Sequence, residues 1–425
     1  MASCARHFSK LLIVLAISLH YFSGAAPAEV AKQEGDSSQT VATPITDSKR
    51  KEFLAAMKAF KKEDVPELER KAEAGDREAQ LMLGAIYQEG LAVEINFVTA
   101  VFWYRKAAEQ GHPMAQNSMG LSYRDGRGVA QDRAEALRWM HKAAGQNYAQ
   151  AQCNIGWAYY RGLGVPADAN EAIKWYRTAM AQGYACAQVL LGIAFLEGKG
   201  VSQDPKQATE LFRKAAEQGD AKGQLYLAIS YDSGSGIKLD HAEAARWYRA
   251  AAEQKDLAAM FALAMSYHNG EGVPKSAEEA EKWFRSASDA GWAPATYYLG
   301  KMYADRKFQM SAMTGTIAIQ LFEKSAEQGY SLGALELSDI FSSRLLAGHL
   351  WVSKDDEKAC RWLIVARELN NHDRWESVRP EDSAIVRKEL LERITKMEKK
   401  FKQGLSGCER SATEWIKAHQ TKPNL

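Results

Sequence analysis

Residues 187–219 read AQVLLGIAFLEGKGVSQDPKQATELFRKAAEQG, and the chain repeats the pattern of this stretch. It contains two apolar runs, one around Leu191-Gly192 and one that ends at Gly219, separated by the turn Gly198-Lys199-Gly200-Val201. The Gly192 position recurs at intervals of 36 residues, as Gly84, Gly120, Gly156, Ala228, Ala264 and Gly300. Self-similarity at such a period indicates a stack of similar supersecondary units. The sequence therefore predicts one elongated repeat structure.

Both runs of each copy have the periodicity of a helix. Apolar residues four positions apart lie on one helical face, so each copy predicts a pair of helices. The first helix carries a small residue beside its apolar face. The second carries a large residue that we expect to fit against it as a plug: Trp103, Trp139, Trp175, Leu211, Trp247, Trp283 and Leu321. The predicted fold class is all-α.

The Gly-x-Gly-Val turn is predicted to end the first helix of a pair. A glycine in the left-handed conformation commonly ends a helix because it has no Cβ to clash. A phosphate-binding loop is the other reading of such a turn, but no strand precedes it and it recurs in copy after copy. We therefore interpret the turn as a structural element of the repeat.

Composition and charge limit the classes of partner. The chain has 425 residues, of which 46% are hydrophobic and 25% are charged, as in a folded protein. Its formal charge is +2, and setting aside Arg6 and Lys10 with the predicted leader leaves 55 − 2 = 53 bases against 53 acids. A neutral chain gives no electrostatic basis for binding nucleic acid or an anionic membrane.

Residues 1–28 have the features of a signal peptide. Two basic residues precede a 12-residue apolar run from Leu11 to Phe22, and Ala26-Pro27-Ala28 fits the small-x-small cleavage pattern. An uncleaved anchor is the alternative, although the run is short for a bilayer. No later stretch has 18 uninterrupted apolar residues. We therefore expect no membrane span after signal cleavage, and a periplasmic or secreted protein.

The rest of the chain divides into four segments. Residues 29–47 are polar and aperiodic, as in a disordered tether. Residues 48–78 predict N-terminal capping helices, 79–370 seven repeats and a degenerate eighth, and 371–425 C-terminal capping helices. Caps are expected because terminal repeats must cover an apolar face, and capped ends make a monomer the expected state.

Four cysteines remain once Cys4 is set aside with the leader, an even number that permits disulfides in an exported chain. Cys153 and Cys186 fall in neighbouring copies, so we predict that they can approach one another and form a disulfide. Two free, buried thiols are the alternative.

The repeat motif resembles a known family. The pattern A-x-x-x-L-G-x-x-Y-x-x-G-x-G-V, followed by A-x-x-W-Y-x-x-A-A-x-x-G, is similar to the Sel-one-like repeat, a relative of the tetratricopeptide repeat. The resemblance covers roughly Ala72 to Ala366. It implies a right-handed superhelical solenoid of antiparallel helix pairs whose first helices line the concave side. Members of the family act mostly as adaptors and scaffolds.

Sequence motifs of metal and nucleotide chemistry are missing. The chain has no H-E-x-x-H pair and no P-loop, and its nine histidines include no pair at ligand spacing. We therefore expect no catalytic residue, no metal and no cofactor. One cysteine-rich branch of the resembled family is linked to β-lactam hydrolysis, but the paired cysteines of its repeats are absent here.

Positions that vary between copies indicate a binding surface. With the opening alanine of each copy (Ala79 in the first) as position 0, positions 2, 6 and 9 of the first helix form a second, mostly apolar stripe. The predicted partner-binding groove contains Leu121, Arg124, Trp157, Tyr160, Ile193, Leu196, Leu225, Ile229, Phe261, Met265, His268 and Tyr297, with Asp232 and Lys301 also at its rim. The alternative is that positions 2 and 6 are buried against the next repeat as ordinary core.

The predicted function is a protein-interaction scaffold of the cell envelope. It would hold partner peptides or helices in the apolar concave groove. Two alternatives stay open: a hydrolase of the β-lactamase-linked branch, and a protein that binds cell-wall glycan or polysaccharide.

Overall fold

The computed structural model describes residues 61–304, 312–343, 355–371 and 405–420, together with single positions between 52 and 60, the pairs 345–346 and 350–351, and residues 391, 392 and 395. The predicted signal peptide and tether lie outside the described residues. The expected all-α fold is confirmed. The described chain departs from it only in a two-residue antiparallel strand pair, β1 (Leu345–Leu346) and β2 (Leu350–Trp351).

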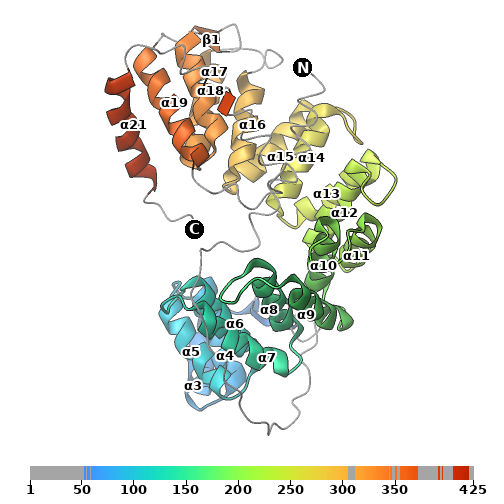
Figure 1. The fold of residues 1–425 in the computed structure, drawn as a ribbon. Coiled ribbons are helices and arrows are strands. Elements are labelled where there is room, and N and C mark those ends of the chain that lie inside the picture. Colours follow the sequence, from blue (N-terminus) through green and yellow to red (C-terminus); the bar gives the residue numbers. More distant parts are fainter. Residues whose placement is uncertain are drawn as a thin grey trace. The chain divides into compact units, whose positions relative to one another are not determined.

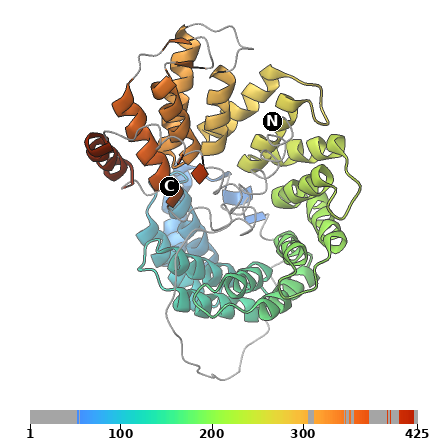
Figure 2. The same cartoon turned by 45° about the horizontal axis from the view of Figure 1, so that its top comes forward.

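The chain divides into two compact units, with the boundary between Tyr226 and Leu227 inside α12 (Ala221–Ser233). Within the N-terminal unit, consecutive helices pack side by side in chain order (Figures 1 and 2). Its elements are η1 (Lys62–Asp64), α3 (Val65–Glu73), α4 (Arg77–Glu89), α5 (Phe97–Glu109), α6 (Pro113–Asp125), α7 (Arg133–Gly145), α8 (Ala149–Arg161), α9 (Ala169–Ala181), α10 (Ala185–Glu197) and α11 (Pro205–Glu217).

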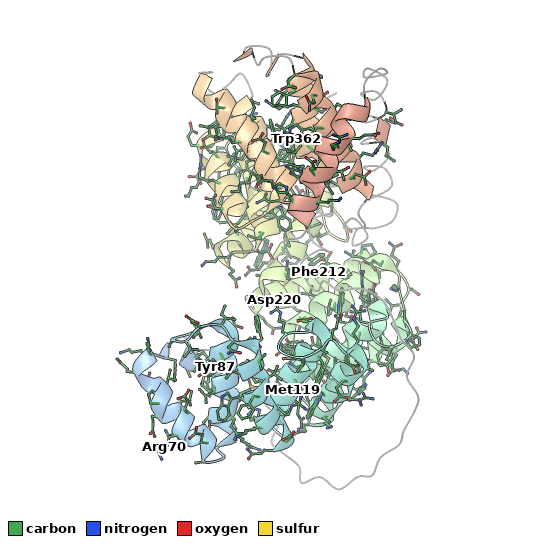
Figure 3. All side chains as sticks on the ribbon, turned by 90° about the vertical axis from the view of Figure 1, so that its left-hand side faces the viewer. Arg70, Tyr87, Met119, Phe212, Asp220 and Trp362 are labelled. Carbon is green, nitrogen blue, oxygen red and sulfur yellow. The ribbon has the colours of Figure 1, made fainter. Side chains whose placement is uncertain are left out.

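The C-terminal unit continues the same succession of paired helices. Its elements are α13 (His241–Glu253), α14 (Leu257–Asn269), α15 (Ala277–Asp289), α16 (Ala293–Ala304), α17 (Ala312–Glu327), α18 (Ser331–Ser343), α19 (Asp356–Asn371) and α21 (Leu405–Gln420). Packing of α21 against α19 brings Trp415 to Trp362, with ring centroids 5.1 Å apart. Trp362 is almost fully buried (Figure 3). The assignment of residues 371–425 as C-terminal capping helices stays a prediction.

The small residue of the first helix leaves space for a large side chain of the second helix, in most pairs an aromatic ring. A Cβ added to Gly192 on α10 would lie 2.5 Å from the ring of Phe212 on α11, and one added to Gly156 would lie 2.7 Å from Tyr176. Phe212 and Tyr176 are completely buried. The expected close approach is therefore confirmed, since nothing larger than glycine fits there without a shift.

The predicted plug residue of the second helix is wrong by one position. The side chain that fills this space is the residue after the predicted one, such as Tyr104 rather than Trp103 in the first copy. Trp103 instead packs with Ala72, Ala79 and Leu83, where it covers the junction with α3. Neighbouring residues on a helix point about 100° apart, so one of them faces its own pair and the other faces a neighbouring pair.

The turn glycines have the predicted left-handed geometry. Gly198 ends α10 with φ of 67°, and Gly200 follows with φ of 76°. A Cβ on Gly200 would lie 2.6 Å from the carbonyl oxygen of Ala169, the first residue of α9. The first glycine therefore ends its helix, while the second allows the turn to approach the preceding helix pair.

A ladder of glutamine side chains connects neighbouring repeats. In one rung, Nε2 of Gln146, just after α7, donates to Oε1 of Gln116 on α6 at 2.8 Å and to the carbonyl oxygen of Gly111 at 2.9 Å. Nε2 of Gln116 in turn donates to the carbonyl oxygen of Ala108 at 3.2 Å. The same pairing joins Gln110 to Gln80, Gln182 to Gln152 and Gln218 to Gln188, in each case within one helix pair. The bonds to backbone carbonyl oxygens reach the preceding pair, so the ladder satisfies buried polar groups both within and between repeats.

The first turn contains an alanine where later copies have the second glycine. Ala92 has φ of 64°, a left-handed conformation in which a Cβ costs about 1 kcal/mol. We therefore expect Ala92→Gly to raise the free energy of unfolding by about 0.5–1 kcal/mol, measured by urea titration. The control is Ala130→Gly, in the next turn, where the backbone is not left-handed. Stabilisation by Ala130→Gly, or destabilisation by Ala92→Gly, would contradict this account.

His112 caps α6 in its neutral form. Its Nδ1 accepts from the backbone N–H of Ala115 at 3.4 Å, and its Nε2 lies 3.0 Å from Glu78. Burial lowers the pKa of His112, opposed by the carboxylate of Glu78 and aided by Arg77. A lowered pKa means that the unfolded chain binds the proton more tightly, so stability falls as pH drops below the ordinary histidine value of about 6.5.

The expected loss is about 1 kcal/mol, the usual value of an N-cap, because a proton on Nδ1 removes the acceptor. Chemical denaturation between pH 7.5 and 5 measures it. His112→Asn keeps a neutral cap acceptor and should have a shallower pH dependence than the parent chain. Identical slopes for both proteins would exclude this role for His112.

Candidate functional site

The part of the predicted groove at position 2 is core. Leu225 and Phe261 are fully buried, and Tyr297 is 7% exposed. The ring of Phe261 lies 5.6 Å from that of Phe284 in its own pair and 5.3 Å from that of Tyr298 in the next first helix. Assignment of Leu225 and Phe261 to a partner-binding surface is therefore wrong, and the alternative of a core position holds.

Position 6 retains partly exposed side chains in most copies. Leu121, Trp157, Ile193 and Ile229 are half-buried, whereas Met265 is only 5% exposed and belongs to the core. Trp157 on α8 and Ile193 on α10 pack against the same apolar cluster of the N-terminal unit. These two side chains occupy equivalent positions in adjacent copies. They therefore form a small apolar surface, which we call the Trp157 surface.

Polar groups next to the Trp157 surface form hydrogen bonds with other residues of the chain. Tyr160, one of the predicted groove residues, is 4% exposed, and its hydroxyl donates to Oε2 of Glu197 at 2.6 Å. Lys199 donates to the carbonyl oxygen of Tyr160 at 2.8 Å, and its Nζ lies 4.3 Å from the Tyr160 ring. Burial raises the pKa of Tyr160 and lowers that of Lys199. Tyr160 therefore joins neighbouring repeats and presents little surface to a partner.

Two further groove residues lie at position 9 of the N-terminal unit. Leu196 is half-buried, and Arg124 pairs with the neighbouring carboxylate of Asp125, with Nε to Oδ1 at 2.6 Å. In the C-terminal unit, Oδ1 of Asp232 lies 2.7 Å from Nδ1 of His241. Arg124 and Asp232 therefore each contact a titratable side chain that is close in the sequence.

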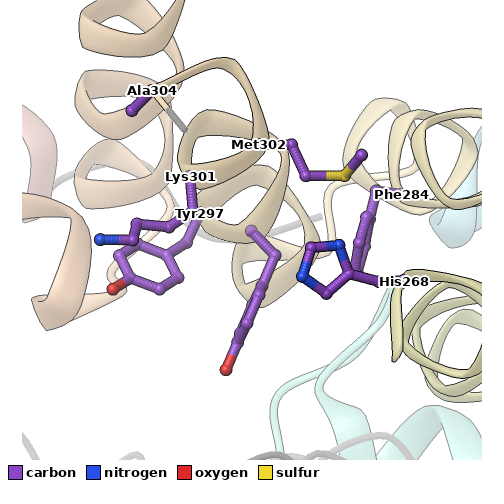
Figure 4. A pocket seen from close by; sticks show the side chains of 7 residues that line it. His268, Phe284, Tyr297, Lys301, Met302 and Ala304 are labelled. Atoms are coloured by element: carbon purple, nitrogen blue, oxygen red, sulfur yellow. The ribbon is translucent and has the colours of Figure 1, made fainter. Parts of the chain in front are cut away.

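The C-terminal unit contains a pocket of about 420 Å³, here called the α16 pocket. It is lined by His268 from α14, Phe284 from α15, and Tyr297, Tyr298, Lys301, Met302 and Ala304 from α16 (Figure 4). The predicted groove residues His268 and Tyr297 and the predicted rim residue Lys301 are brought together here. Three consecutive helices therefore contribute to one site.

Aromatic rings form one wall of the α16 pocket. The ring of Tyr298 stacks on Phe284 with centroids 5.9 Å apart and meets Tyr297 edge-on at 5.3 Å. Burial raises the pKa of Tyr298 to about 12, so the phenol is neutral at physiological pH. Rings held in this way present an apolar face whose shape is fixed by packing.

A charged pair lies at the edge of the α16 pocket. Nζ of Lys301 lies 3.2 Å from Oε1 of Glu336 on α18, and the hydroxyl of Tyr297 donates to the same oxygen at 3.0 Å. Lys301 and Tyr297 point to the same side of α16 (Figure 4). The pocket thus combines an apolar wall with hydrogen-bonding groups at one edge, an arrangement that orients a bound group.

The sequence contains one pattern that resembles the nucleophile elbow of a hydrolase. Gly329-Tyr330-Ser331-Leu332-Gly333 fits G-x-S-x-G, in which the serine must be exposed on a turn between a strand and a helix. Here Ser331 opens α18, follows the helix α17, and is fully buried. The pattern therefore belongs to the repeat and is not a nucleophile elbow. Among the described residues, no three or more His, Cys, Asp or Glu side chains gather as metal ligands.

One exposed apolar patch lies on a second helix, whereas the predicted groove contains only residues of first helices. Ile95, Val98 and Phe102 are 60%, 69% and 49% exposed, around the start of α5. The positions equivalent to Phe102 in later copies carry Arg138, Lys174, Glu210, Arg246 and Lys282. Comparing second helices between copies would have identified this patch, which we call the Phe102 patch.

Comparison with known proteins identifies the family. A family model described as Sel1 repeat matches eight segments, residues 77–112, 113–148, 149–184, 187–220, 221–256, 257–292, 293–330 and 335–371. The chain belongs to the Sel1 repeat family. The eighth segment, residues 335–371, corresponds to the predicted degenerate eighth repeat. Proteins of this family are scaffolds that typically mediate protein interactions.

Two solved structures illustrate the similarity. A protective antigen of uropathogenic Escherichia coli strains that displays an SLR fold is 30% identical, with a TM-score of 0.52 and coverage of 84% of this chain and 76% of that one. A Sel1 repeat protein from Oxalobacter formigenes is 37% identical, with a TM-score of 0.46 and coverage of 50% and 85%. Comparison with curated proteins finds no significant match. None of the described helices has the length and apolar character needed to cross a membrane.

Proposed function

We propose that this Sel1 repeat protein is a non-enzymatic scaffold whose α16 pocket receives an apolar side chain of a partner polypeptide. The observation that carries this proposal is the convergence of His268, Tyr297 and Lys301 in one pocket. All three occupy positions that vary between copies, so the pocket depends on residues that the repeat itself does not require.

The size and walls of the α16 pocket support a side-chain guest. A volume of about 420 Å³ lies within the range of ligand pockets and suits one or two large side chains. Phe284 and Tyr298 provide a rigid aromatic face, and residues of this kind supply much of the binding energy at protein interfaces. Lys301 and Glu336 at the edge can pair with backbone or charged groups beside the inserted side chain.

The proposed setting is the cell envelope, with the protein exported to the periplasm or secreted. This part of the proposal is supported by the N-terminal sequence, where Arg6, Lys10 and the apolar run precede Ala26-Pro27-Ala28. Glycan binding and β-lactam hydrolysis are the other functions to test. A peptidoglycan pull-down and a nitrocefin assay on the purified chain should both be negative, and activity in either would overturn the proposal.

Partner binding in the pocket can be tested by charge reversal. Lys301→Glu should lower partner affinity by roughly tenfold, because it removes the base at the edge of the pocket and places a second acid beside Glu336. The matched control is Arg246→Glu on α13, which also reverses one base in an exposed pair with a glutamate. A photo-crosslinking amino acid at either position then reports contact directly in cells.

The expected result is a crosslinked partner from position 301 and none from position 246. The same partner should be recovered less well with the Lys301→Glu variant than with the Arg246→Glu variant. Equal crosslinking and equal recovery at both positions would place the interface elsewhere and exclude the α16 pocket.

The Phe102 patch is a second candidate interaction surface. The observation that favours it is the exposure of three apolar side chains in the first copy, one of which, Phe102, occupies a position that is charged in the later copies from Arg138 to Lys282. Phe102→Lys restores the type of residue found at Lys174 and Lys282. We expect the unfolding free energy to change by less than about 0.5 kcal/mol, since this is a surface position.

Binding through the Phe102 patch predicts that Phe102→Lys reduces partner recovery while the thermal unfolding curve is unchanged. Lys174→Ala on α9, at the equivalent position of a later copy, is the control and should leave recovery intact. Unchanged recovery with Phe102→Lys would remove this surface from the proposal.

A further inference from the structure

Two thiols from adjacent repeats lie in contact within the N-terminal unit. Sγ of Cys153 on α8 and Sγ of Cys186 on α10 are 3.3 Å apart, and both cysteines are free. The predicted approach of these residues is therefore found, although the pair is present as two thiols. A disulfide bond is about 2.05 Å long, so closing it requires a movement of little more than an ångström between the sulfurs.

The two cysteines differ in access to solvent. Cys153 is 2% exposed and packs among Tyr160, Tyr176 and the apolar residues of its cluster, whereas Cys186 is half-buried near the start of α10. An external reagent can therefore reach the sulfur of Cys186 first. The sulfur of Cys153 is positioned behind it, in contact with the atom that it would attack.

The surroundings of Cys153 favour its protonated form, the thiol. Burial raises the pKa of its thiol, and the neighbouring Cys186 and the carboxylate of Asp220 act in the same direction. The hydroxyl of Tyr176 is buried there without a hydrogen-bond partner, and burial also raises the pKa of Tyr176. The described causes of the pKa shift of Cys153 all raise it, and none is a basic side chain that would lower it. A buried thiol of this kind is inert toward reagents in solution.

We propose that Cys153 and Cys186 form a thiol–disulfide exchange site that accepts a small disulfide, such as oxidised glutathione, and closes to a bond between neighbouring repeats. The thiolate of Cys186 attacks one sulfur of the small disulfide and expels a thiolate. Cys153 then loses its proton and attacks the Cys186 sulfur, which expels the second thiolate.

The exchange balances without another reactant. Two protein thiols and one small disulfide give one protein disulfide and two small thiols, the two protons passing to the expelled thiolates through solvent. The two protein sulfurs are oxidised and the two sulfurs of the small disulfide are reduced. The new bond would join α8 to α10, which carry Trp157 and Ile193, and would thereby hold the two halves of the Trp157 surface together.

The test uses the full purified chain and oxidised glutathione, with mass spectrometry of peptides after alkylation of free thiols. We expect a linked peptide pair containing Cys153 and Cys186, with two hydrogen atoms lost and no glutathione retained. The Cys153→Ser variant should retain glutathione on Cys186, at a level roughly tenfold or more above the parent chain, because the resolving thiol is missing.

The Cys186→Ser variant provides the opposite control. Cys153 should then stay unmodified, since its sulfur is buried, and Cys360, which is disulfide-bonded, should be unaffected in every sample. Circular dichroism checks that both variants are folded, and the parent chain alone decides the outcome if either is not. A parent chain that ends with glutathione on Cys186, or with both thiols free, would overturn the proposal.

Discussion

The structure depends on the close approach of the two helices within each pair. In pairs such as Gly192 with Phe212, a glycine on the first helix meets an aromatic ring on the second, and no Cβ fits between them. Contact at this distance buries the ring fully and restricts how far each helix can slide along its partner. The spacing within a pair therefore sets the thickness of the repeat that the next pair packs against.

Much of this fold could be predicted from the sequence because its signals are periodic. The period of 36 residues, the helical spacing and the turn glycines each recur, so a weak local signal is repeated in many copies. The sequence pattern did not show whether Trp103 or Tyr104 packs against Gly84 as the plug. Both are large and adjacent, and only the rotation of the second helix about its axis decides which one meets Gly84.

The candidate site was harder to predict because it depends on contacts between repeats. Phe261 shares a helical stripe with His268, yet Tyr298 of the next repeat covers Phe261, while His268 is partly accessible. The pairing of Tyr297 and Lys301 with Glu336 joins residues 39 and 35 positions apart. A helical wheel describes one helix, so it cannot show which part of its stripe a neighbouring pair will cover.

The glutamine ladder has different partners within a repeat and across its boundary. Gln116 and Gln146 pair inside one copy, whereas their bonds to the preceding copy end on the backbone carbonyl oxygens of Ala108 and Gly111. Where Met260 replaces the acceptor glutamine, Ala290 stands in the same copy where the donor would be, so both polar partners are lost together and neither is left buried alone. A backbone carbonyl is present whatever the side chain, so a repeat that carries its own glutamine pair can keep these bonds when it is moved behind a different repeat.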